Sequence, residues 1–195
     1  MNRRYFLSAA SLASTVALLP KSGSAQDADL PNEADIGFCR DMAIHHAQAL
    51  VMCQRVLGRD TGDLVQAAAA EVLQNQAIEI GYMRAWLADW GESTVPPEVV
   101  MGWMGANNGD GMPVGAMPGY ATNEELLELS QLSGMARGKR WLELMRAHHV
   151  GGVMIATAAV EHCQLTKVIK LAAGQQQVQE YEISQYDVLL STVYT

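Results

Sequence analysis

The stretch Met-Ala-Ile-His-His at residues 42–46 occurs in the chain a second time, as Met-Arg-Ala-His-His at residues 145–149. The offset is 103 residues (45 to 148), and Gln-x-x-Glu-Ile at 76–80 returns at the same offset at 179–183. In each copy the second histidine precedes the glutamine by 30 residues (46 to 76 and 149 to 179). Two motifs that recur in register indicate an internal repeat of one structural unit.

The repeated unit is predicted to be a helical hairpin. From Phe38 to Val56 the apolar residues recur every three or four positions, which is the period of one helix face. A turn at 58–62 separates this helix from a second one over about 63–90. The Pro- and Gly-rich residues 91–121 predict a loop, followed by a helix from Thr122 or Asn123 to about Val160 and another over about 166–193.

The fold class expected from this pattern is all-α. Two hairpins that each expose one apolar face would bury those faces against each other as a four-helix bundle. The predicted domain spans residues 33–193, with hairpin 35–90, a long Gly/Pro/Met-rich linker at 91–121 and hairpin 122–193.

Charge and the N-terminal sequence restrict the partners and the location. The 195 residues carry 13 Lys+Arg against 21 Asp+Glu, a net charge of -8, which argues against nucleic acid and an anionic membrane surface as partners.

Arg3 and Arg4, a short apolar run and the small residues 23–25 predict a cleavable export signal over 1–25. The adjacent arginines fit a twin-arginine signal, and an ordinary secretory signal fits as well. We expect a periplasmic or secreted protein without a membrane span after cleavage.

The repeated side chains are predicted to meet at one level of the bundle. His46 and Gln76 lie at similar distances from the turn near residue 60, and Glu79 follows Gln76 one helix turn later. The second hairpin would repeat this arrangement. The resulting set contains imidazoles, carboxylates and thioethers, which are metal ligands: His45, His46, His148, His149, Glu79, Glu182, Met42 and Met145.

A structural interpretation competes with this one. A core histidine is usually a satisfied hydrogen-bond partner, and a methionine on an apolar face usually fills space. Adjacent histidines also point about 100° apart on a helix, so both members of a pair cannot face the axis equally. However, four of the five histidines fall in the repeat, which packing does not explain. We therefore favour metal binding.

The two His-His segments (41–52 and 144–154) and the two Gln-x-x-Glu segments (76–87 and 179–183) resemble the domain-of-unknown-function family 305 over roughly residues 33–190. The resemblance implies a ferritin-like four-helix bundle that binds copper or silver outside the cytoplasm, and it adds Met52 as a candidate ligand. Two positions depart from the family pattern. Met154 follows its histidine pair one place earlier than Met52 does, and Tyr186 stands where the family usually has methionine.

Imidazole suits several transition metals, and thioether sulfur selects Cu(I) and tolerates Ag(I), so copper is favoured over silver, zinc and nickel. The expected function is copper binding for metal homeostasis or resistance. A ferritin-like metalloenzyme with a His/Glu site and a metal-free helical interaction module are the alternatives. Met101, Met104, Met112 and Met117 fall in the linker, where they could collect soft cations or form an apolar latch. A disulfide among Cys39, Cys53 and Cys163, and a homo-oligomer, are left open.

Overall fold

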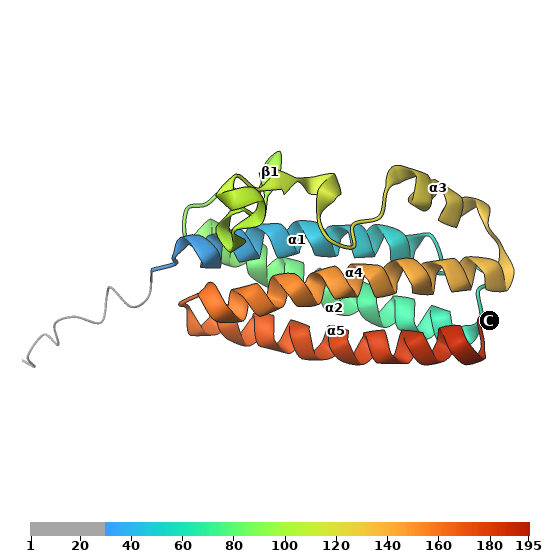
Figure 1. The fold of residues 1–195 in the computed structure, drawn as a ribbon. Coiled ribbons are helices and arrows are strands. Elements are labelled where there is room, and N and C mark those ends of the chain that lie inside the picture. The colour runs from blue at the N-terminus through green and yellow to red at the C-terminus, as the bar shows by residue number, and fades with distance from the viewer. Residues whose placement is uncertain (1–29) are drawn as a thin grey trace, which may run out of the picture.

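The computed structural model describes residues 30–195, so the expected export signal at 1–25 lies outside the described residues. Four long helices lie side by side (Figure 1), and the all-α class predicted from the sequence is confirmed. Helix α1 packs along α2, α4 packs along α5, and α1 and α4 join the two pairs. The bounds are α1 (Glu33–Gln54), α2 (Asp63–Asp89), α4 (Gly134–His162) and α5 (Thr166–Thr192).

Local sequence explains where the helices begin and end. Helix α1 starts at a capping box in which the side chain of Asn32 accepts from the Asp35 amide and the Asp35 carboxylate accepts from the Asn32 amide. Helix α2 begins at Asp63, where the sequence predicted it, after Gly62 adopts a positive φ of 86°. Within residues 30–195, no helix combines the length and apolar character needed to cross a membrane.

The single helix predicted from residue 122 or 123 to about 160 is wrong. It is divided into α3 (Asn123–Gln131) and α4, because Leu132 and Ser133 are extended, with ψ angles of 163° and 164°. Gly134 then has a φ of 55°, a value that glycine adopts without strain. The predicted capping residue is correct, since the Thr122 hydroxyl accepts from the amide of Glu125.

The linker is more ordered than predicted. It forms a short antiparallel pair, β1 (Val99–Val100) with β2 (Met112–Pro113), and three 3-10 turns, η1 (Gly102–Met104), η2 (Ala106–Gly109) and η3 (Val114–Ala116). Met101 and Met117 are only 2% and 3% exposed, and Met104 and Met112 pack against the same core. The linker methionines therefore pack against the bundle, which favours the apolar latch over the soft-cation cluster.

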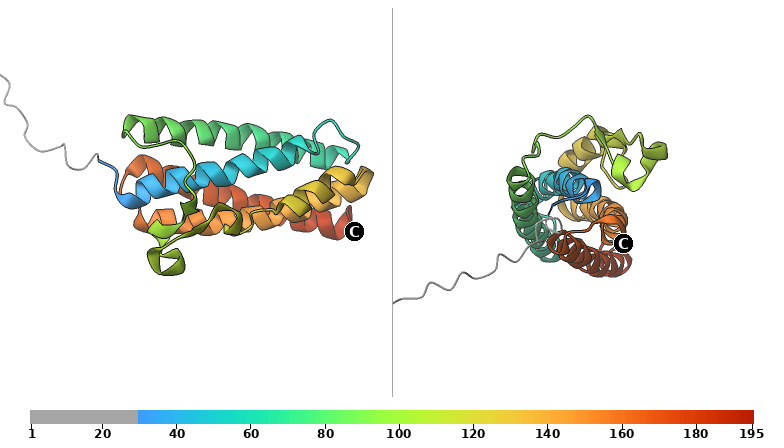
Figure 2. Two further views of the ribbon diagram at one scale, coloured as in Figure 1. Left: turned by 90° about the horizontal axis from the view of Figure 1, so that it is seen from above. Right: turned by 90° about the vertical axis from the view of Figure 1, so that its left-hand side faces the viewer.

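Two side chains of α1, the carboxylate of Asp41 and the amide of Gln48, hold the linker through hydrogen bonds. The Asp41 carboxylate accepts from the Met101 amide at 2.7 Å and from the Trp103 indole at 2.8 Å. Further along, the Gln48 side chain donates to the carbonyl oxygen of Ala121 at 2.8 Å and accepts from its amide at 2.6 Å. The linker consequently covers the bundle along α1, as Figures 1 and 2 show.

The interior of the bundle consists of two apolar cores separated by polar side chains. The first core contains Phe38, Met83, Ile155 and Val168, one from each long helix, together with their neighbours. The second core contains Met52, Val72, Trp141 and Tyr186 in the same way. Between them every long helix contributes buried or partly buried polar groups, which we call the polar layer: His45, His46, Gln76, Glu79, His148, His149, Gln175, Gln179 and Glu182.

Candidate metal centre

The four repeated histidines occupy the polar layer, and each is 0% exposed. The rings of His45 and His148 stack between α1 and α4, with centroids 3.7 Å apart and planes at 27°. The other member of each pair turns toward its own hairpin partner, as the angle between adjacent helical residues requires. The ring centroids of the adjacent residues are 6.5 Å apart for His45 and His46 and 6.1 Å for His148 and His149.

His46 and His149, the two histidines outside the stacked pair, each contact a glutamate of the other helix in their hairpin. His46 Nε2 lies 2.7 Å from Glu79 Oε2, and His149 Nε2 lies 2.6 Å from Glu182 Oε2. The sequence predicted that Gln76 lies level with His46, and Gln76 does lie in the polar layer. The hydrogen bond of His46, however, is made with Glu79, one helix turn after Gln76. A carboxylate is the stronger acceptor for a ring N–H, which explains the choice.

The two stacked rings have different partners. His148 Nε2 lies 2.9 Å from the carbonyl oxygen of His45, across the repeat offset of 103 residues. His45 Nε2 instead lies 3.2 Å from the carbonyl oxygen of Pro118 in the linker. This carbonyl comes close because Gly151 of α4 has no side chain, and a Cβ built there would lie 1.9 Å from the Pro118 oxygen. The linker therefore breaks the symmetry of the repeat at this point.

These contacts assign the tautomer of all four rings. Each Nε2 faces an oxygen, a backbone carbonyl for His45 and His148 and a carboxylate for His46 and His149, so Nε2 is assigned the hydrogen in each ring. In His45 and His148, whose pKa values burial lowers, Nδ1 is then the bare nitrogen with a lone pair. Within the described residues, each of the four Nδ1 atoms is buried without a hydrogen-bond partner. A buried ring with one nitrogen bonded to oxygen and the other bare is oriented as a metal ligand.

Burial also keeps the stacked pair neutral. Desolvation lowers the pKa of His45 to about 3, and the neighbouring His46 adds to the effect. Desolvation, followed by the proximity of His45, lowers the pKa of His148 well below 6.5. Neutral imidazole is the form that binds metal ions.

The thioethers lie on both sides of the polar layer. Met42 belongs to the first core, and Met52 and Met145 belong to the second, all three at 0% exposure. Met154, by contrast, is 43% exposed. Within residues 30–195, no three His, Cys, Asp or Glu side chains are arranged to hold one ion between them. The polar layer thus brings the imidazoles and carboxylates together, but an ion shared by both halves requires side chains to move.

Several residues near the site were not singled out from the sequence. Pro118 and Gly151 contribute through backbone and empty space, for which a single sequence carries no signal. Gln175 does carry a sequence signal, because it stands where the first repeat has Val72 (72 plus 103) and places a buried polar group there.

The Tyr186 ring fills the position of the expected methionine and packs 5.8 Å from the Trp141 ring and 5.5 Å from the His149 ring. The three cysteines are free and buried.

Comparison with known proteins places the chain in a family. Its residues 35–190 match the family described as Domain of unknown function (DUF305). A DUF305 protein from Streptomyces coelicolor is 38% identical, with a TM-score of 0.73 over 81% of this chain and 93% of that one. A DUF305 fragment from Deinococcus radiodurans is 24% identical, with a TM-score of 0.70 over 84% and 99%.

The same fold occurs in CopM in its Cu(I)-bound form, at 19% identity and a TM-score of 0.65 over 83% of this chain and 98% of that one. CopM has also been solved in a Cu(II)-bound form, which is 22% identical with a TM-score of 0.60. No curated protein matches the sequence. From the match across residues 35–190 and the Streptomyces relative, we conclude that this chain belongs to the DUF305 family.

Proposed function

We propose that this protein is an exported copper-binding protein that holds Cu(I), and Ag(I) in its place, for metal homeostasis or resistance. The observation that carries the proposal is the set of four buried imidazoles whose Nε2 atoms are bonded to oxygen and whose Nδ1 atoms have no hydrogen-bond partner within residues 30–195. The copper-bound forms of CopM support it at the level of the fold. Export is supported by the N-terminal sequence and by the naming of the Streptomyces relative as a secreted protein.

Copper is favoured by the combination of ligands. Neutral imidazoles from both hairpins lie in one layer, and the thioethers of Met42, Met52 and Met145 lie in the cores on either side of it. Imidazole together with thioether suits Cu(I) better than zinc or nickel. In this proposal, Glu79 and Glu182 orient His46 and His149 through the bonds already formed, a role that raises the affinity of the rings for the ion.

An ion would reach the layer from the side of α2 and α5. The linker covers the opposite side, where Pro118 bonds His45 and Ala121 bonds Gln48. Toward α2 and α5, the side chains of Glu79 and Glu182 are 24% and 15% exposed although their histidine partners are fully buried. These two carboxylates are therefore the part of the layer that solvent reaches.

The test is anaerobic competition for Cu(I) between a chelating dye and the protein without residues 1–25. The double variants His45→Gln/His46→Gln and His148→Gln/His149→Gln keep an N–H donor but lack the imidazole. Each should lose affinity steeply, and by similar factors if the halves share an ion. His162→Gln is the control, since His162 lies exposed at the end of α4, outside the polar layer.

Other results would favour the remaining alternatives. Preference for zinc over Cu(I) in the same competition would assign zinc, rather than copper, to the site. Oxygen consumption by the metal-loaded protein would support a ferritin-like metalloenzyme. Undiminished Cu(I) affinity in both folded double variants, checked by circular dichroism, would refute the histidine site and leave a metal-free interaction module.

A further inference from the structure

A small cavity of about 20 Å³ lies between α2 and α5 within the polar layer. Its lining is made of four pairs of repeat-equivalent positions, because adding 103 to each residue of α2 gives the residue of α5. The cavity therefore lies on the approximate twofold axis that relates the hairpins. The pairs are Val72 and Gln175, Asn75 and Val178, Gln76 and Gln179, and Glu79 and Glu182.

Each half of the repeat supplies three oxygen-bearing side chains to this cavity. From α2 they are Asn75, Gln76 and Glu79, and from α5 they are Gln175, Gln179 and Glu182. His46 and His149 contact only the Oε2 atoms of Glu79 and Glu182. The hydrogen bonds of the described residues thus leave Oε1 of both carboxylates unused. Two carboxylates and four amides are ligands for a hard divalent cation.

The buried amides lack partners for their oxygens. Gln76, Gln175 and Gln179 are 4%, 2% and 3% exposed, and within residues 30–195 the Oε1 atom of each has no hydrogen-bond donor. Gln175 is directed into the space between the helices, because its Nε2 donates to Glu79 Oε2 on α2 at 3.1 Å. The amide end of Gln179 lies against Gly152 of α4, so Gln76 and Gln175 supply the unpartnered oxygens at the cavity. A buried acceptor without a partner costs about 1–3 kcal/mol, so the two indicate a missing donor or cation.

The sequence of the repeat supports the same conclusion. Position 72 of the first half is a buried valine, and its equivalent in the second half is the amide of Gln175. A valine would fill this space without a desolvation penalty. Position 75 shows the reverse exchange, with Asn75 opposite Val178, so each half still presents three polar groups to the cavity. Asn75 and Val178 are both exposed, so the buried exchange at position 72 is the one that packing does not explain.

We propose that this cavity binds one Ca²⁺ ion through the carboxylate and amide oxygens of the two halves. A cavity of about 20 Å³ admits a single occupant of the size of a water molecule, which requires about 10–15 Å³. Ca²⁺ accepts six to eight oxygens in irregular geometry, whereas Mg²⁺ retains several waters that this cavity does not accommodate. The calcium site would share Glu79 and Glu182 with the polar layer, but its ligands are oxygens, whereas the imidazoles and thioethers proposed for copper supply nitrogen and sulfur.

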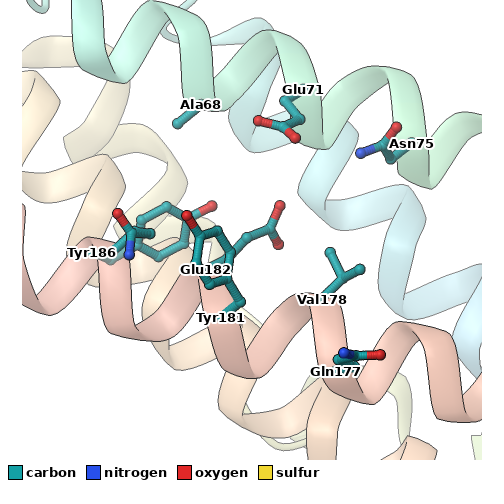
Figure 3. A pocket seen from close by; sticks show the side chains of 9 residues that line it. Ala68, Glu71, Asn75, Gln177, Val178, Tyr181, Glu182 and Tyr186 are labelled. Atoms are coloured by element: carbon teal, nitrogen blue, oxygen red, sulfur yellow. The ribbon is translucent and has the colours of Figure 1, made fainter.

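A groove of about 690 Å³ leads to the cavity from solvent and shares Asn75, Val178 and Glu182 with it. Figure 3 shows Glu71 and Asn75 on α2 facing Glu182 and Tyr181 on α5 across this groove. The carboxylates of Glu71 and Glu182 make the entrance negative, which attracts a divalent cation.

The test is calorimetric titration of CaCl₂ and, separately, MgCl₂ into chelator-treated protein without residues 1–25. We expect one Ca²⁺ per chain, a rise in melting temperature with calcium and weaker binding of Mg²⁺. Gln175→Val, which installs the residue of the other half, should weaken Ca²⁺ binding by about tenfold or more. It should not lower the stability of the calcium-free protein, because valine removes a buried amide oxygen that has no partner in residues 30–195.

Gln176→Val is the matched control, since Gln176 is partly exposed and bonds only Glu180. It should bind Ca²⁺ as the unmodified protein does. Absence of calorimetric binding would overturn the proposal. Binding that Gln175→Val leaves intact would also overturn it, because the ion would then lie on surface carboxylates. Neither outcome depends on whether the histidines bind copper.

Discussion

The contact between the linker and α4 can be tested by adding one methyl group. In Gly151→Ala, the new Cβ would lie 1.9 Å from the Pro118 oxygen, 2.5 Å from the Pro118 carbonyl carbon and 3.3 Å from the Gly119 nitrogen. All three atoms belong to the backbone, so no side-chain rotation relieves the clash. The linker has to move away from α4, and the bond from His45 Nε2 to the Pro118 oxygen lengthens or breaks.

The expected loss of stability follows from three contributions. Overpacking of this kind costs about 1–3 kcal/mol, and a buried His45 N–H without its acceptor costs about 1–3 kcal/mol more. Alanine is favoured over glycine in a helix by about 1 kcal/mol, which offsets part of the loss. The free energy of unfolding should therefore fall by about 1–5 kcal/mol, with a central value of about 3 kcal/mol.

The assay is urea denaturation of the metal-free protein followed by far-UV circular dichroism. The control is Gly81→Ala in α2, where a Cβ would meet no atom within 4 Å. This variant should gain up to about 1 kcal/mol from helix propensity alone. If Gly151→Ala is as stable as Gly81→Ala, the Pro118 carbonyl does not rest on α4, and the account of the His45 contact is wrong.

Three further predictions concern the buried groups. Because burial lowers the pKa of His45 to about 3, the unfolded chain binds a proton near pH 6.5 that the folded chain excludes. Stability of the apoprotein should therefore fall below about pH 6.5 by up to about 1.4 kcal/mol per pH unit for this residue, and urea titrations of His45→Gln should show a shallower slope. Tyr186→Phe should be neutral or stabilising by about 1 kcal/mol in thermal melts, because its buried hydroxyl has no partner in residues 30–195; a clear loss would reveal one. Burial raises the pKa of Cys53 to about 12, so a thiol reagent should label it only in urea, and rapid native labelling would contradict the packing.

The internal repeat made much of the site predictable. Histidine pairs at equal spacing from Gln-x-x-Glu strings required equivalent positions in two hairpins, and the structure brings the four imidazoles and two glutamates into one layer. The starts of α2, α3 and α5 were predictable as well, and at α3 the capping residue Thr122 acts on its own neighbour Glu125. Local rules and symmetry were sufficient for these features.

The linker could not be predicted in this way, because its order depends on contacts between distant residues. Asp41 bonds the amide of Met101, 60 positions away, and Gln48 bonds Ala121, 73 positions away. Neither pair follows from periodicity or from turn residues. The break before α4 was not predicted for another reason, because only Leu132 and Ser133 lie between the two helical segments.

The division of the interior into two apolar cores has a consequence for how the helices are aligned. Apolar faces alone tolerate sliding of one helix along another, because one buried aliphatic contact replaces another. A shift of α2 by one turn, about 5.4 Å, would move Glu79 away from His46 and into contact with an apolar core. A buried charge without its partner is expensive, so the polar layer excludes such slipped arrangements. The polar layer therefore fixes one axial register for all four helices, whether or not an ion is bound.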